Sequence, residues 1–76
     1  MILANRIRHI REAYKLTQAN IAYKCDISPS AYGQIERKAG KCTFETLDKI
    51  ANAIGVTLPF LVDVKNPLFI DEKNKL

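Results

Sequence analysis

A chain of 76 residues can form one small domain but not two, which leaves little room for the deep pocket that most enzymes need. Its hydrophobic fraction of 47% and charged fraction of 26% are typical of globular proteins and exclude disordered and fibrous classes. The net charge of +4 is uneven, because residues 1–43 carry eight basic and three acidic side chains, against four and five in residues 44–76. A basic half indicates a surface that meets a polyanion such as nucleic acid.

The sequence shows neither a membrane span nor a signal peptide, so it predicts a cytoplasmic protein. Cys25 and Cys42 are far apart, and His9 is the only histidine, which does not fit a zinc site. We therefore expect two reduced thiols, no metal and no cofactor, with a redox or metal role as the less favoured alternative.

Apolar residues at helical spacing, separated by glycine and proline, predict an all-α fold. The first helix is expected over residues 2–14. Its buried positions recur every three or four residues: Leu3, Ile7, Ile10 and Tyr14. Its exposed positions are expected to include Arg6, Arg8 and Glu12.

Two short helices with a tight turn between them are expected next. Thr17 can cap a helix that ends near Cys25, and Ser28 followed by Pro29 can begin another. This pattern fits a helix-turn-helix, in which the second helix enters the major groove of DNA. It also fits an ordinary helical hairpin without any DNA-binding role.

The helix that begins at Ser28 is expected to bury one stripe and expose the opposite one. The expected buried stripe consists of Ala31, Tyr32 and Ile35. The expected exposed face consists of Ser30, Gly33, Gln34 and Arg37. Such a compact polar face favours contact with base edges.

After a loop over residues 38–42, Thr43 is expected to cap a fourth helix that ends near Ile54. Gly55 separates it from a short fifth helix that begins after Thr57. The expected buried face of the fourth helix consists of Phe44, Leu47, Ile50, Ala51 and Ile54. Residues 1–64 then form the domain.

Residues 16–62 resemble the phage lambda repressor/Cro-like family of helix-turn-helix regulators, also called the XRE family. The resemblance rests on Leu16-Thr17-Gln18, Ile21-Ala22, Ile27-Ser28, Gln34-Ile35-Glu36-Arg37, Glu45-Thr46-Leu47 and Ile54-Gly55-Val56. It implies a compact five-helix domain that binds double-stranded DNA and regulates transcription, with repression as the expected outcome and no enzymatic activity.

The resemblance also implies roles for individual residues. The base-reading residues would be Pro29, Ser30, Gly33 and Gln34. Gln34 is the first candidate, because a carboxamide can both donate to and accept from adenine. The phosphate-contacting residues would be Arg11, Gln18, Arg37, Lys38, Lys41 and Thr43, of which Gln18 can also brace the recognition helix. Arg11 and Glu36 match an ion pair of the family, although a surface pair of little energetic value is the alternative.

Several positions depart from the family pattern. Asp26 and Lys38 stand where glycine is usual, and Asn20 stands where an acid is common. Pro29 and Gly33 replace longer polar residues on the reading face. We therefore expect modest sequence specificity, or specificity that depends on DNA shape.

Residues 65–76 form a tail that adds apolar surface to the fifth helix. We expect a two-fold homodimer whose interface includes Phe60, Val64, Leu68, Phe69 and Ile70, with a short strand over 67–71. The alternative is a tail that folds back over its own core.

Three other functional classes remain open on sequence grounds. An antitoxin would use the same domain and also bind a toxin, and a protein-binding adaptor would keep the fold without DNA affinity. An enzyme fits poorly, because His9 stands alone and Glu36 and Glu45 have no evident catalytic partner.

Overall fold

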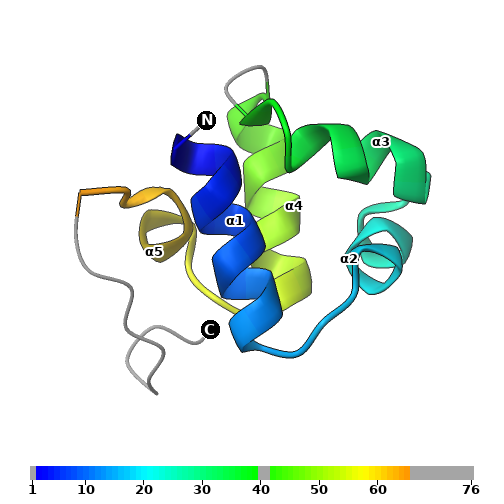
Figure 1. The fold of residues 1–76 in the computed structure, drawn as a ribbon, viewed down its shortest axis with the longest axis horizontal. Helices are drawn as coiled ribbons and strands as arrows, with labels where there is room; N and C mark the ends of the chain where they lie inside the picture. The colour runs from blue at the N-terminus through cyan, green and yellow to red at the C-terminus, as the bar shows by residue number, and fades with distance from the viewer. Residues whose placement is uncertain (1, 40–41, 66–76) are drawn as a thin grey trace.

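In the computed structural model, which describes residues 2–39 and 42–65, five helices form a compact bundle (Figure 1). They are α1 (Ile2–Ala13), α2 (Gln18–Cys25), α3 (Pro29–Ile35), α4 (Phe44–Ile54) and α5 (Leu58–Val62). The all-α, five-helix prediction is confirmed. Within those two ranges, no helix is both long and apolar enough to cross a membrane.

The starts of α2 to α5 are set by hydroxyl caps, as the sequence predicts. Thr17, Ser28, Thr43 and Thr57 each accept a hydrogen bond from the backbone N–H three residues later, at 3.0–3.3 Å. Each bond satisfies a donor that the helix itself leaves unpaired. In α2 the Oδ1 atom of Asn20 accepts in return from the backbone N–H of Thr17 at 3.0 Å. An amide therefore completes the capping box that an acid often completes.

The ends of α2 and α4 use left-handed residues. Asp26 has φ 59° at the end of α2, and its neighbour Ile27 donates its N–H to the carbonyl of Ala22 at 3.0 Å. Gly55 has φ 96° at the end of α4. Asp26 thus adopts the conformation that glycine usually supplies at this turn, which is tolerated by aspartate at modest cost.

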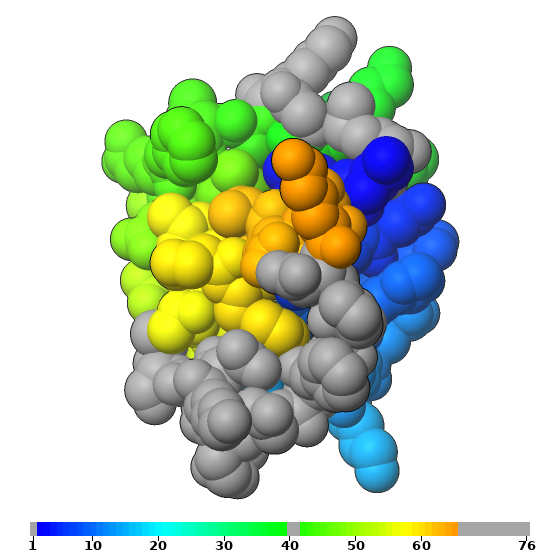
Figure 2. Space-filling view, turned by 90° about the vertical axis from the view of Figure 1, so that its left-hand side faces the viewer, coloured from blue at the N-terminus to red at the C-terminus, as the bar shows by residue number. Residues whose placement is uncertain are grey.

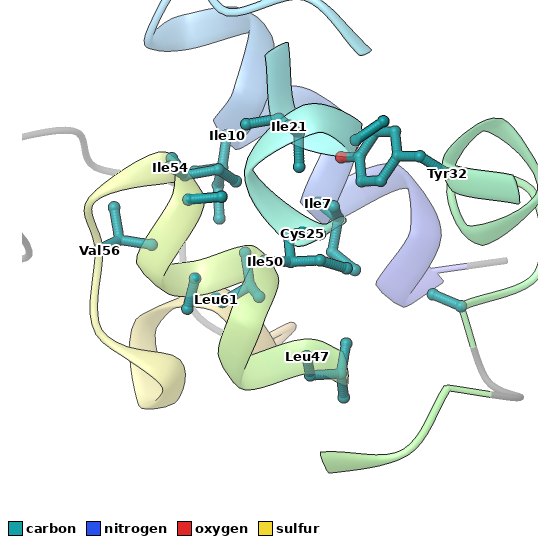
Figure 3. Close-up of a cluster of buried hydrophobic side chains, with 14 of the residues drawn as sticks. Ile7, Ile10, Ile21, Cys25, Tyr32, Leu47, Ile50, Ile54, Val56 and Leu61 are labelled. Atoms are coloured by element: carbon teal, nitrogen blue, oxygen red, sulfur yellow. The ribbon is translucent and has the colours of Figure 1, made fainter. Parts of the chain in front are cut away.

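The core is built from all five helices. In Figure 1, α5 lies on one side of α1 and α4, whereas α2 and α3 lie on the other side. α5 packs against α1 and α4, and α2 packs against α3 and α4. The largest fully buried side chains are Ile7, Ile10, Ile21, Tyr32, Ile50, Val56 and Leu61 (Figure 3).

Arg6 is the clearest departure from the expected faces. We expected it at the surface, but only 8% of the residue is exposed. Its Nε and Nη2 atoms donate to the backbone carbonyl of Phe60 at 3.1 and 2.7 Å, and its guanidinium lies 5.1 Å from the centre of the Phe60 ring. These contacts satisfy the charged group while its aliphatic stem is buried, and they join α1 to α5.

Two apolar residues expected in the core are at the surface. Phe44 is 75% exposed because it is the first residue of α4, where the helix extends past the core. Ala31 is exposed because α3 packs mainly against α2, which covers only a narrow stripe of the helix. The expected burial of these two residues is therefore wrong, whereas Leu3, Tyr14 and Ile35 are half-buried against the core.

Candidate nucleic-acid interface

The outer face of α3 is open to solvent. Pro29, Ser30 and Gln34 are exposed along it, and the basic residues Arg37 and Lys38 are exposed just beyond its C-terminal end. In Figure 1, α3 lies at the periphery of the bundle, with α2 beneath its start and the beginning of α4 beside its end. Three of the four predicted base-reading residues are thus accessible to a large ligand.

Gly33 is the exception, because it is buried rather than exposed. A Cβ built at this position would lie 3.7 Å from Gln18 Oε1 and 3.8 Å from Arg37 Nη1. The side chains of Gln18 and Arg37 therefore cover the middle of α3. The expected exposure of Gly33 is wrong, and any contact of its backbone with bases would require these side chains to move.

A buried ion pair holds the C-terminal end of α3 to α1. Arg11 Nε donates to Glu36 Oε2 at 2.6 Å, and Arg11 Nη2 donates to Glu36 Oε1 at 3.1 Å. The two side chains are only 11% and 3% exposed, so the pair is not a weak surface contact. Arg11 Nη1 also donates to the carbonyl of Leu16 at 2.7 Å. Arg11 thus supports α3 from within, and little of its guanidinium is left for a phosphate.

Gln18, the first residue of α2, connects the same carboxylate to the second helix. Its Nε2 atom donates to Glu36 Oε1 at 3.1 Å. Helices α1, α2 and α3 therefore meet at the carboxylate of Glu36. This contact braces the C-terminal end of α3 from α2.

The electrostatics of this junction keep both partners charged. Burial tends to raise the pKa of Glu36. Three neighbours lower it and hold this pKa below its ordinary value of 4.5: the hydrogen bond from Arg11, the Tyr32 hydroxyl and the hydrogen bond from Gln18. The hydrogen bond to Glu36 in turn raises the pKa of Arg11. Burial and the adjacent carboxylate raise the pKa of Tyr32, so its buried hydroxyl stays protonated although it makes no hydrogen bond of good geometry.

A hollow of about 500 Å³ lies beside α3, toward the start of α4. Its lining combines apolar and basic groups: Ala31, Gln34, Ile35, Arg37, Lys38 and Cys42. The two cations make this side of the helix attractive to an anionic backbone. Cys42 and Cys25 are free thiols, and burial raises the pKa of each, which favours the protonated form.

The other predicted site residues are distributed as follows. Thr43 is exposed, but its hydroxyl caps α4, and Lys41 lies outside the described residues. Phe60 of α5 is half-buried, and Val64, two residues after this helix, is 40% exposed. Figure 2 views the molecule from the side that carries α5. The predicted interface residues Leu68, Phe69 and Ile70, with the strand over 67–71, lie outside the described residues.

One arrangement was missed by the sequence reasoning, namely the position of Arg37 over Gly33. The available signal was their spacing, since residues four apart lie on the same face of a helix. A glycine at the first of these positions leaves room for the arginine to extend back along α3. Sequence reasoning placed Arg37 on the exposed face of this helix and assigned it to the phosphate contacts, but did not place it over Gly33.

Comparison with known proteins gives two matches to the region that contains these helices. A helix-turn-helix family model matches residues 7–61. The immunity repressor protein of Bacillus phage phi105 is 36% identical over 62 residues, which are 82% of this chain and 43% of that protein. The chain thus covers less than half the length of this relative. No solved structure gives a significant match.

Proposed function

Because the chain belongs to the helix-turn-helix family of phage lambda repressor/Cro-like regulators, we propose that it binds specific sequences of double-stranded DNA and represses transcription. Family membership makes it a DNA-binding transcriptional regulator and not an enzyme. Repression is favoured by the similarity to a phage immunity repressor. A regulator of this kind acts where the chromosome lies, so we also place it in the cytoplasm.

The open face of α3 is the observation that carries this proposal. An α-helix fits the major groove of B-DNA, where its side chains can reach base edges. Pro29, Ser30 and Gln34 form the accessible surface, and Gln34 is the residue whose amide can make two hydrogen bonds with adenine. The buried junction at Glu36 holds this helix rigidly, so little order has to be gained on binding.

Phosphate contacts would surround the reading face. The exposed cations Arg37 and Lys38 stand at one end of α3, and Lys41 follows in the chain. Gln18 opens α2 at the other edge, and the N-terminal end of α4 follows Thr43. Such contacts supply affinity and set the register of the helix on the duplex without reading sequence.

A homodimer would place two such helices in successive major grooves, about 34 Å apart, and would favour a near-palindromic site. We propose that residues 1–64 form the DNA-binding domain and that α5 and residues 65–76 form the dimer interface. Phe60 of α5 and Val64, two residues after this helix, support this proposal, because both retain exposed apolar surface, and α5 and α3 lie on different sides of the bundle.

The proposal is tested by selecting duplexes from random DNA and measuring their affinity by fluorescence anisotropy at several salt concentrations. We expect log affinity to fall with log salt with a slope of about −5, as for three cations on each of two protomers. Gln34→Ala should lower the preference for selected over random duplexes by about tenfold, because it removes a base contact. Asn52→Ala removes an exposed carboxamide from α4 and serves as the matched control.

Two results would contradict the proposal. If the wild-type protein bound no duplex DNA, the chain would be a protein-binding adaptor that keeps the fold. If Gln34→Ala behaved like Asn52→Ala, the assignment of base reading to Gln34 would be wrong.

A further inference from the structure

We infer that Arg37, whose guanidinium shares the space above Gly33 with the Gln18 amide, reads a guanine in the major groove. This inference rests on the proposed function and gives one base contact a chemical identity. It moves Arg37 from the phosphate contacts to the reading surface of α3.

The position of Arg37 is the first reason. It lies four residues after Gly33, in the turn that follows α3, and its Nη1 atom is 3.8 Å from the point where a Cβ of Gly33 would be. The side chain therefore extends back over the middle of α3 instead of away from its end. Gly33 lies between the exposed residues Ser30 and Gln34 along α3 and has no side chain of its own. The guanidinium of Arg37 supplies a polar group at this position.

The second reason is that this guanidinium is available. Arg37 is exposed, and within residues 2–39 and 42–65 its side chain makes no hydrogen bond or ion pair, whereas its backbone N–H donates to the carbonyl of Gln34. Arg11, in contrast, donates to Glu36 and Leu16. The five N–H groups of Arg37 therefore remain free for a ligand.

The third reason is the orientation of Gln18. A carboxylate can only accept hydrogen bonds when ionised, so the NH₂ group of Gln18 must face Glu36. The Oε1 atom is then turned toward α3, 3.7 Å from the same Cβ point that Arg37 approaches. It is an acceptor that can hold the guanidinium in one orientation when Arg37 enters the groove. Gln18 acts as a positioning residue, and the Arg11–Glu36 pair fixes Gln18.

Guanine is the base that suits this arrangement. A planar guanidinium can donate two parallel hydrogen bonds to the O6 and N7 atoms of guanine, which is the most common specific contact in DNA recognition. A lysine at the same place offers a point charge without that planar geometry. Lys38, the adjacent cation, is exposed on the hollow beside α3 and suits a phosphate instead.

The test is random-duplex selection followed by competition binding, for the wild-type protein and the variants Arg37→Lys, Gln18→Met and Lys38→Met. We expect the wild type to require a G·C pair at one position of each half-site. Arg37→Lys should reduce the preference for G·C over A·T at that position by about tenfold or more, and should keep the salt slope because the charge is retained. Gln18→Met should weaken the preference at the same position only. Lys38→Met should lower the affinity for all sequences alike.

Three results would each contradict a different part of this inference. If Arg37→Lys keeps the full G·C preference at every position, Arg37 contacts phosphate only, and this inference fails while the proposed function stands. If Gln18→Met leaves that preference intact, the positioning role of Gln18 is wrong. If the wild-type protein shows no preference among duplexes, the proposed function fails, and this inference fails with it.

Discussion

Glu36 is the residue on which the position of α3 depends most directly. Its carboxylate joins Arg11 of α1 and Gln18 of α2 at the C-terminal end of α3. The sequence could identify the pairing of Arg11 and Glu36, because both positions match a known family pattern. The near-complete burial of this ion pair could not be predicted from the sequence, because it depends on how α1 and α2 pack against the two side chains.

Removing the cation of this pair should be costly. Arg11→Met leaves a buried carboxylate without its partner, and we expect a loss of about 3–5 kcal/mol in the free energy of unfolding, measured by urea denaturation. Arg8→Met is the matched control, because Arg8 is an exposed arginine of the same helix and should change stability by less than about 0.5 kcal/mol. Equal losses in the free energy of unfolding for the two variants would show that the ion pair stabilises the protein no more than an exposed arginine does.

The same pair predicts how stability depends on pH. The pKa of Glu36 in the folded protein lies below its ordinary value of 4.5, so its stabilising contribution is complete above about pH 4.5 and is lost as pH falls through the folded-state pKa. Glu36→Gln should therefore lower the Tm at neutral pH and flatten the fall in Tm on acidification. Glu45→Gln, at an exposed position, should keep the slope of the wild type. A wild-type slope in Glu36→Gln would contradict this account.

At the scale of the helices, the boundaries were more predictable than the faces. Caps such as Ser28 and stop signals such as Gly55 act locally, so the sequence alone predicts the helix ends to within a residue or two. The exposure of Phe44 and the burial of Arg6 depend on where neighbouring helices end. The hydrophobic periodicity of one helix does not show where its neighbouring helices end.

Two glycines of the helices should respond in opposite ways to substitution by alanine. At Gly33 a Cβ would make ordinary van der Waals contacts at 3.7 and 3.8 Å, so Gly33→Ala should stabilise the protein by about 0.5–1 kcal/mol. At Gly55 the φ of 96° strains any other residue, so Gly55→Ala should destabilise it by about 1 kcal/mol or more. Thermal unfolding compares the two directly, and a destabilising Gly33→Ala would show that Gln18 and Arg37 leave no room above α3.

For the whole molecule, α3 and α5 lie on different sides of the bundle, which would separate the proposed DNA-reading surface from the proposed dimer interface (Figure 1). The fold and the helix-turn-helix were predictable, because periodicity, caps and family motifs all agree. The dimer was less predictable than the fold, because association depends on the shapes of two surfaces and leaves no periodic signal in the sequence of one chain. The proposed interface therefore needs a direct test.

Val64→Asp provides that test. Val64 follows α5 and is 40% exposed, so a carboxylate there should leave the fold intact but place two like charges at a two-fold interface. Sedimentation velocity should show a dimer for the wild type and a monomer for the variant at the same concentration. The control is Asn52→Asp, which adds the same charge at an exposed position of α4. Asp63→Asn is less suitable, because Asp63 makes contacts of its own. A wild-type protein that remains monomeric at high concentration would contradict the dimer.

If α3 is the surface that enters DNA, nuclear magnetic resonance should detect its contact with a duplex. Amide signals of the ¹⁵N-labelled protein would be followed during titration with a selected duplex. We expect large shifts at Ser30, Gln34 and Arg37, with smaller ones along α5. Shifts that leave α3 unchanged and gather on another face would contradict this expectation.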